Sequence, residues 1–239
     1  MSISPPPEIR LAATVLIVRQ GADELDVLLL RRNAQLAFAG GAWVFPGGAV
    51  DTADGLHSAT EEQAARVAAV REAQEECGIV LRPEQLAHFA HWTTPTGEKR
   101  RFATWFFAAV VPSDASDVLI DEGEIHEYRW LSPKAILTAH ASGELNIMPP
   151  TYITVKLLEP FRSAEKAIAA LVQRKPFWVT PKVSVENGKP VLLYPGDAGY
   201  ITNQAKTLGP RHRTLFSESG LQYIHSGDDV GVVAMDDCE

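Results

Sequence analysis

The chain has 239 residues, of which 46% are hydrophobic and 22% charged, and it carries a formal net charge of -8 at pH 7. The acidic balance argues against non-specific binding to nucleic acid or to an anionic membrane. The two cysteines, Cys77 and Cys238, form no CxxC pair, so we expect neither a disulfide framework nor a thiolate zinc site. With no basic leader and no apolar run of bilayer length, a cytoplasmic location is expected.

The N-terminal part of the chain predicts a strand pair followed by a glycine-rich loop. Residues 11–18 and 25–32 are apolar runs around a Gly-Ala-Asp turn signal, which is typical of paired strands. Residues 39–55 are rich in glycine and contain one short strand, AWVF, within a long loop.

Residues 58–78 predict a helix with clear end signals. Ser58 or Thr60 can cap its start, with Glu61 or Gln63 completing a capping box, and Gly78 follows its end. One face is apolar and includes Cys77, which we expect to be a buried packing residue.

The next segments complete an alternation of strands and helices. Residues 86–95 and 100–111 predict strands joined by a turn through Gly97, and residues 124–131 predict another strand that leads into a helix starting at Ser132-Pro133. The strands come in hairpin-like pairs. The pattern therefore predicts an α/β (α+β) protein with a mixed sheet and helices on both faces.

The pattern of predicted elements changes near residue 145, where the alternation of strands and helices ends. This suggests a domain over 8–145 and an extension over 146–239 that packs on it. The extension is expected to contain helices at 146–161 and 163–174, a hairpin at 182–194 with an Asn-Gly turn, and a loosely ordered acidic end at 227–239.

Three glutamates of the predicted helix, Glu72, Glu75 and Glu76, are spaced i, i+3 and i+4 and project from one face. Like charges this close raise one another's pKa unless a cation lies among them, and a hard ion such as Mg2+ or Mn2+ prefers oxygen ligands. Arg71, four residues before Glu75, can hold that carboxylate in an ion pair. Taken alone, the helix indicates either a metal site or a solvated acidic helix end.

The stretch REAQEECGI resembles half of the Nudix box, R-E-U-x-E-E-x-G-U, in which U is apolar and x is any residue. The matching residues are Arg71, Glu72, Ala73, Glu75, Glu76, Gly78 and Ile79. FPGG at 45–48 and WLSP at 130–133 belong to the same resemblance. The resemblance to Nudix hydrolases implies the Nudix fold, a mixed β-sheet sandwiched between helices, here with a C-terminal helix-plus-hairpin extension.

The same resemblance implies metal-dependent hydrolysis of a diphosphate linkage. The implied ligands of Mg2+ or Mn2+ are Glu72, Glu75, Glu76 and the carbonyl of Gly48. The general base would be Glu76, Glu75, or Glu124 in the acidic loop before RW. Arg71 completes the expected catalytic set.

One part of the box departs from the family pattern. G-x5-E-x7-R places 13 residues between glycine and arginine, whereas the 22 residues 49–70 separate Gly48 from Arg71, an insertion of nine. Counting back eight positions from Arg71 reaches Gln63, so the first glutamate of the box is expected to be missing.

Longer stretches at 27–51, 91–111 and 127–137 resemble the coenzyme A and acyl-CoA diphosphatase branch. This implies that CoA or acyl-CoA is cleaved to (acyl-)phosphopantetheine and adenosine 3′,5′-bisphosphate. Asn33 and Ala37 stand where that branch has arginines. ADP-ribose, NADH or another nucleoside diphosphate derivative is therefore kept as an alternative substrate, and a non-catalytic Nudix-fold ligand sensor as a second alternative.

Basic residues near strand ends are the expected phosphate contacts. Arg32, in RR at 31–32, and Arg101, in KRR at 99–101, are chosen for this role, against the alternative that they are surface charges. The expected partner is a small nucleoside diphosphate substrate, with no nucleic acid and no membrane. A homodimer is expected by analogy with the family.

Overall fold

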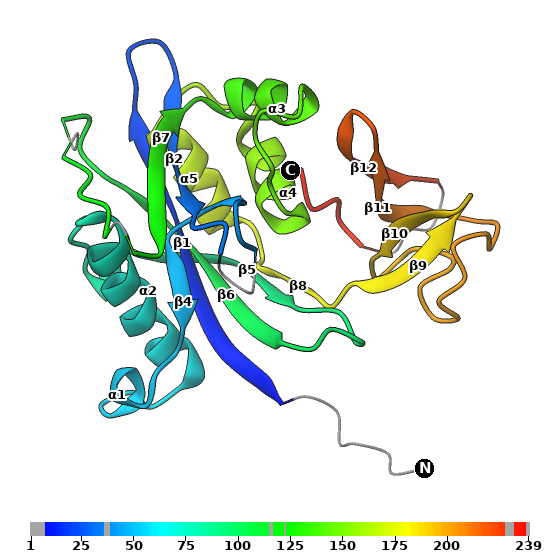
Figure 1. The fold of residues 1–239 in the computed structure, drawn as a ribbon, viewed down its shortest axis with the longest axis horizontal. Coiled ribbons are helices and arrows are strands. Elements are labelled where there is room, and N and C mark those ends of the chain that lie inside the picture. The colour runs from blue at the N-terminus through cyan, green and yellow to red at the C-terminus, as the bar shows by residue number, and fades with distance from the viewer. Residues whose placement is uncertain (1–7, 36–38, 115–116, 122, 228–231, 238–239) are drawn as a thin grey trace.

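The computed structural model describes residues 8–35, 39–114, 117–121, 123–227 and 232–237. Its centre is an eight-stranded mixed sheet in the order β3-β2-β1-β6-β5-β8, with β4 paired to β1 and β7 to β2 (Figure 1). The strands are β1 (Ile9–Gln20), β2 (Leu25–Arg32), β3 (Trp43–Val44), β4 (Gly47–Ala49), β5 (Ala87–Thr93), β6 (Arg101–Val110), β7 (Ile125–Leu131) and β8 (Phe177–Val179). The β1–β6 and β5–β8 pairs are parallel and the others antiparallel.

Strand β1 is buried on both faces because its apolar side chains alternate between two cores. Val15 and Ile17 pack with helix α2 (Glu61–Cys77), whereas Leu16 and Val18 belong to the core on the opposite face. That second face is covered by α3 (Pro133–Ala141), α4 (Pro149–Leu158) and α5 (Ala164–Gln173) (Figure 1). The expected mixed sheet between helices is confirmed. Within the described residues, no helix is long and apolar enough to cross a bilayer.

The predicted helix ends are formed by local hydrogen bonds. The Thr60 hydroxyl accepts a hydrogen bond from the Gln63 amide at 3.2 Å, so Thr60 is the cap of α2, and Gly78 ends the helix with a left-handed φ of 73°. Ser132 caps α3 in the same way through the amide of Ala135. These elements follow from short-range sequence signals, as predicted.

The glycine-rich segment contains more regular structure than expected. Besides β3, which matches the predicted strand, it forms β4 and a one-turn helix, α1 (Thr52–Gly55). β4 has the sequence Gly-Gly-Ala, which has little intrinsic preference for a strand. It forms because Gly48 and Ala49 pair with Ala13 and Ala12 of β1. Ala37, noted in the sequence, lies outside the described residues.

The C-terminal part builds a second, four-stranded antiparallel sheet in the order β12-β11-β10-β9. Its strands are β9 (Lys182–Glu186), β10 (Lys189–Leu193), β11 (Arg211–Ser217) and β12 (Gly220–Ser226). The predicted hairpin is β9–β10, with left-handed Asn187 and Gly188 at its turn. The extension therefore has more strands than expected. β11 escaped notice because it buries three consecutive polar residues, His212, Arg213 and Thr214, and so shows no alternation.

Arg213 of β11 and Asp197 form a buried ion pair. Arg213 is 1% exposed and donates to both Asp197 oxygens, Nε to Oδ2 at 2.7 Å and Nη2 to Oδ1 at 2.8 Å. The Asp197 carboxylate also accepts hydrogen bonds from the amides of His212 and Gly199. Burial alone would raise the pKa of Asp197, but these hydrogen bonds and the Arg213 charge hold it below its usual range.

The acidic end of the chain is packed where it is described, so the expectation of a loosely ordered end is wrong for residues 232–237. Met235 is 1% exposed, its carbonyl accepts a hydrogen bond from Arg174, and its amide donates to the Tyr223 hydroxyl. Asp236 pairs with Lys156 at 3.5 Å. The buried Met235 side chain and these polar contacts together hold this stretch in place. Residues 228–231 and 238–239 lie outside the described residues.

We expect Asp197→Ala to destabilise the protein by about 3 kcal/mol at pH 7, because the buried Arg213 charge loses its two shortest carboxylate contacts and keeps only Glu186, at 3.2 Å. The pKa of Asp197 is lower in the folded than in the unfolded chain. Its stabilising effect is therefore complete above pH 3.8 and is lost as the pH falls through the folded pKa. Urea unfolding of both proteins between pH 7 and pH 3 should show the difference shrinking. An equal difference at both pH values would contradict this assignment.

Candidate active site

The glycine-rich loop is fastened to the centre of the sheet. The Pro46 carbonyl accepts hydrogen bonds from the Val15 amide at 2.9 Å and from the Thr14 hydroxyl at 2.8 Å. A Cβ on Gly47 would lie 2.4 Å from the Ala13 carbonyl oxygen, so only glycine fits there. The loop therefore has one position relative to β1.

Two glutamates of α2 lie directly against this loop. The Gly47 amide donates to Glu76 Oε2 at 2.8 Å. A Cβ on Gly48 would lie 2.3 Å from Glu72 Oε1, so the second glycine is required for the carboxylate to approach the backbone. The structure thus brings together Gly48, Glu72 and Glu76, as the sequence predicted.

Arg71 connects the helix to the segment after the loop. Its guanidinium donates to Glu72 Oε1 and Glu75 Oε2, both at 2.9 Å, which confirms the predicted pair with Glu75. It also donates to the Ala49 carbonyl at 3.1 Å and to both Asp54 oxygens, at 3.1 and 3.0 Å. The hydrogen bond with Asp54 is the main reason that the pKa of Arg71 is raised above its usual range.

Asp54 is the functional residue that the sequence reasoning missed. It lies in α1, is 4% exposed, and forms a bidentate pair with Arg71. Counted forward from Gly48, Asp54 occupies the acidic position of G-x5-E. The box therefore keeps an acid there, and the nine extra residues follow Asp54. Counting from the glycine as well as from the arginine would have found it.

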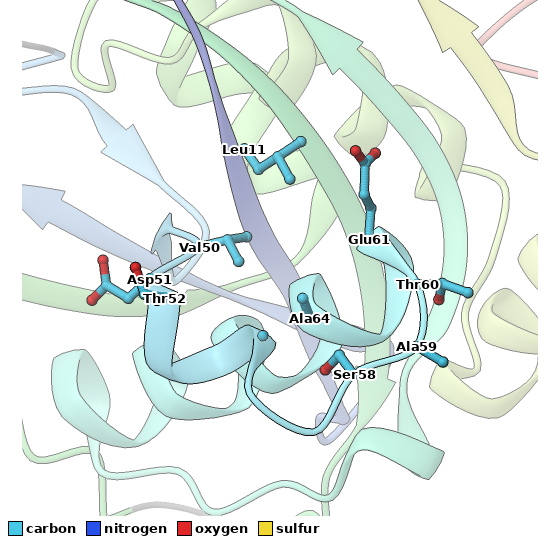
Figure 2. A pocket seen from close by; sticks show the side chains of 10 residues that line it. Leu11, Val50, Asp51, Thr52, Ser58, Ala59, Thr60, Glu61 and Ala64 are labelled. Atoms are coloured by element: carbon cyan, nitrogen blue, oxygen red, sulfur yellow. The ribbon is translucent and has the colours of Figure 1, made fainter.

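Residues after Asp54 line part of a pocket of about 460 Å³ (Figure 2). Leu11 and Val50 contribute apolar side chains, and residues 58–61, which lead into α2, line it as well. Because Val50 directly follows β4, this pocket begins two residues beyond Gly48. The insertion therefore borders a hollow whose lining does not include Glu72, Glu75 or Glu76, and it leaves the two halves of the box in contact.

Glu72, Glu75 and Glu76 form what we call the glutamate cluster. Arg32, at the end of β2, and Glu124, in the loop before β7, lie beside it. Arg32 Nη1 lies 3.8 Å from Glu76 Oε1, and its Nη2 lies 3.3 Å from Glu124 Oε2. The Asp121 side chain accepts a hydrogen bond from the Glu124 amide at 2.9 Å and shapes this loop. Two residues chosen from separate parts of the sequence are thus neighbours here.

Arg101 is placed differently. Its guanidinium donates to the carbonyl oxygens of Thr94 and Pro95, in the β5–β6 hairpin to which it belongs. It lies at the start of β6, opposite Ile9 of β1. Arg101 therefore organises its own turn and is not bonded to the glutamate cluster.

The cluster carries more negative than positive charge in a buried position. Burial and then the charges of Glu75 and Glu124 raise the pKa of Glu72, although Arg71 opposes this. Burial and the charges of Glu72 and Glu124 raise the pKa of Glu76 to about 8, against the Gly47 hydrogen bond and the Arg32 charge. Oxygen donors with excess negative charge fit a hard divalent cation.

The carboxylates are not already assembled around one point. Across the described ranges, no three His, Cys, Asp or Glu side chains are arranged to hold a metal ion. Arg71 holds Glu72 and Glu75, and Gly47 with Arg32 holds Glu76. The donor types therefore fit a metal, while their present partners are protein groups.

The chain is similar to a family model and to several solved structures. The model of the NUDIX domain family matches residues 8–149. A NUDIX hydrolase from Alicyclobacillus acidocaldarius is 26% identical, with a TM-score of 0.61, over 68% of this chain and 96% of that one. A Nudix hydrolase from M. smegmatis is 25% identical, with a TM-score of 0.43, over 63% of this chain and 84% of that one. A MutT NUDIX hydrolase from Burkholderia pseudomallei is 18% identical, with a TM-score of 0.46, over 62% of this chain and 97% of that one.

The family match covers more than half of the chain and includes every residue of the glutamate cluster. The Alicyclobacillus structure supports the same fold over nearly its whole length. Nudix hydrolases act on nucleoside diphosphate derivatives and generally use divalent metals such as Mg2+ or Mn2+. The chain therefore belongs to the NUDIX family, and it is a pyrophosphohydrolase of nucleoside diphosphate derivatives.

Proposed function

We propose that this protein hydrolyses the diphosphate of CoA or acyl-CoA, releasing (acyl-)phosphopantetheine and adenosine 3′,5′-bisphosphate. The observation that carries the diphosphate chemistry is the contact of Glu72 and Glu76 with the Gly47-Gly48 backbone. The choice of CoA is supported by the resemblance of residues 27–51 and 91–111 to that branch and by the insertion within the box.

The side chains of the site are proposed to have two roles, metal binding and the orientation of the metal ligands. Glu72, Glu75, Glu76 and the Gly48 carbonyl are proposed to hold Mg2+ or Mn2+, which would neutralise the diphosphate charge and make a water more acidic. Arg71, fixed by Asp54, orients Glu72 and Glu75. Arg32 holds Glu76 and Glu124 on either side of its guanidinium.

The general base is proposed to be one of three carboxylates. Glu75 and Glu124 have side chains 59% and 58% exposed, so both can meet a water that enters with the substrate. Glu76 is 6% exposed at its side chain and is held by the loop amide, which suits it better for metal binding. The three single replacements with Gln would separate these roles.

Two alternatives from the sequence analysis are retained: a different nucleoside diphosphate substrate and a ligand sensor without catalysis. ADP-ribose or NADH would use the same glutamates, and only the contacts outside the diphosphate would differ. A ligand sensor without catalysis would have no need for an acidic cluster that is costly to bury. A homodimer and a cytoplasmic location stay predictions.

A substrate panel tests the proposal directly. Purified protein with Mg2+ or Mn2+ is incubated with CoA, acetyl-CoA, a long-chain acyl-CoA, dephospho-CoA, ADP-ribose and NADH, and products are identified by mass spectrometry. We expect adenosine 3′,5′-bisphosphate from the CoA compounds. Cleavage of ADP-ribose or NADH alone would discard the CoA assignment, and no cleavage of any compound would favour the sensor.

Glu76→Gln should lower kcat about a hundredfold or more, because it removes a charged ligand from the centre of the cluster. The neutral amide has nearly the same shape, so the thermal unfolding of the metal-free protein should not be impaired. Glu84→Gln, at an exposed position in the 3-10 turn Pro83–Gln85, is the matched control and should keep full activity. A fully active Glu76→Gln would refute the assignment.

Asp54→Asn should reduce kcat/KM by roughly ten- to a hundredfold, because Arg71 loses the charged partner that orients it. Asp51→Asn is the matched control: its carboxylate is 62% exposed and lies 3.8 Å from Arg71. We expect that control to change kcat/KM less than about threefold. Steady-state kinetics of the two variants tests this prediction. Equal decreases in kcat/KM would show that Asp54 does not orient Arg71 more strongly than Asp51 does.

A further inference from the structure

Asn33 joins the loop after β2 to the loop before β7. It directly follows Arg32 at the end of β2, and its backbone amide donates to the Glu124 carbonyl at 2.7 Å. Its side-chain Nδ2 donates to the Gly123 carbonyl at 3.1 Å, and its Oδ1 accepts from the Gln35 amide at 3.0 Å. The side chain thus donates to one loop and accepts from the other, which a carboxylate or an apolar group in its place could not do.

An irregularity in the β2–β7 ladder prepares this contact. Arg31 is paired with Glu127 of β7. The next pair joins Arg32 to Ile125, so His126 is an extra residue and forms a bulge. A bulge of this kind turns the side chains beyond it to the other face of the sheet. Ile125 therefore enters the core under α2, and the residue before it comes to lie beside the end of β2.

The loop before β7 is fixed by further hydrogen bonds. The Asp121 carboxylate accepts from the amides of Glu124 and Ile125, both at 2.9 Å. The Leu119 amide donates to the Cys77 carbonyl at 3.1 Å, at the end of α2. Both the amide and the carbonyl of Glu124 are thus hydrogen-bonded, although its side chain is 58% exposed. An exposed carboxylate on a fixed backbone can meet a ligand without the entropic cost of ordering a loop.

The fixed backbone places the Glu124 carboxylate beside the glutamate cluster. Its Oε2 lies 3.3 Å from Arg32 Nη2, and Nη1 of the same guanidinium lies 3.8 Å from Glu76 Oε1. Arg32 and Asn33 are adjacent in the chain. The end of β2 therefore holds Glu124 twice, by its side chain through Arg32 and by its backbone through Asn33.

We propose that Asn33 is a positioning residue for Glu124: its side-chain amide connects the two loops and so keeps the Glu124 carboxylate within reach of the glutamate cluster. Asn33 then acts on the reaction only through Glu124 and does not contact the substrate. The inference rests on the proposed function. It deepens that function by selecting Glu124 from the three candidate bases and by assigning a role to a residue outside the Nudix box.

A double-mutant cycle tests this role, with whichever compound of the substrate panel the wild type cleaves. Asn33→Leu removes both side-chain hydrogen bonds at similar volume, and kcat should fall about tenfold with KM unchanged. Glu124→Gln should lower kcat about a hundredfold. The double variant should be no slower than Glu124→Gln alone, because Asn33 then has no carboxylate to position. Decreases that multiply in the double variant, or a higher KM with unchanged kcat, would overturn the inference.

Hydrogen–deuterium exchange measures the positioning without any reaction. The amides of Glu124 and Ile125 should exchange faster in Asn33→Leu than in the wild type. The matched control is Asn146→Leu, at an exposed position between α3 and α4, which should change neither kcat nor this exchange. If the wild type cleaves no compound of the panel, the proposed function fails, while faster exchange still supports the positioning of Glu124 by Asn33. Unchanged exchange would overturn the inference whether or not CoA is cleaved.

Discussion

The glutamate cluster depends on the close approach of helix α2 to the glycine-rich loop, which brings two carboxylates against the loop backbone. Gly47 and Gly48 remove side chains from the loop, so that Glu76 receives an amide hydrogen bond and Glu72 lies against Gly48. The helix contributes by facing the sheet with alanines. Ala65, Ala68, Ala69 and Ala73 are all 0% exposed, and small side chains shorten the distance between packed elements. The sequence of α2 thus serves packing on one side and charge on the other.

Charge balance follows from this geometry. Buried carboxylates must be paired or hydrogen-bonded, and Arg71 pairs with Glu72 while Arg32 lies near Glu76. Each arginine also holds one exposed carboxylate, Glu75 for Arg71 and Glu124 for Arg32. Arg71 is itself oriented by Asp54, immediately before the extra residues. The entropy of closing a loop grows slowly with its length. Nine additional residues between two fixed points, Asp54 and Arg71, are therefore compatible with an unchanged cluster.

The sequence was informative where structure follows from neighbours along the chain. Helix α2 with its caps, the Asn187-Gly188 turn and the Glu72–Glu76 spacing are all local features, and all were predicted. The features that were missed depend on distant partners. β4 needs β1 to exist as a strand, and β11 can bury its polar residues because distant side chains receive them, Asp197 and Glu186 for Arg213 and Tyr194 for Thr214. The position of Asp54 became clear only from its contact with Arg71.

The family match ends at residue 149, but the packing of the catalytic half does not. Helices α4 and α5 share one hydrophobic core with β1, β2 and β5: Ile153, Ala167 and Leu171 are fully buried there with Leu16 and Leu29. β8 then extends the central sheet by pairing with β5, and Arg174 binds the last packed residues, 234–235. Without this part, the face of the sheet opposite α2 would expose an apolar surface to water. β1 contributes side chains to that apolar face and also contacts the glycine-rich loop. We therefore infer that the C-terminal part supports the glutamate cluster through β1.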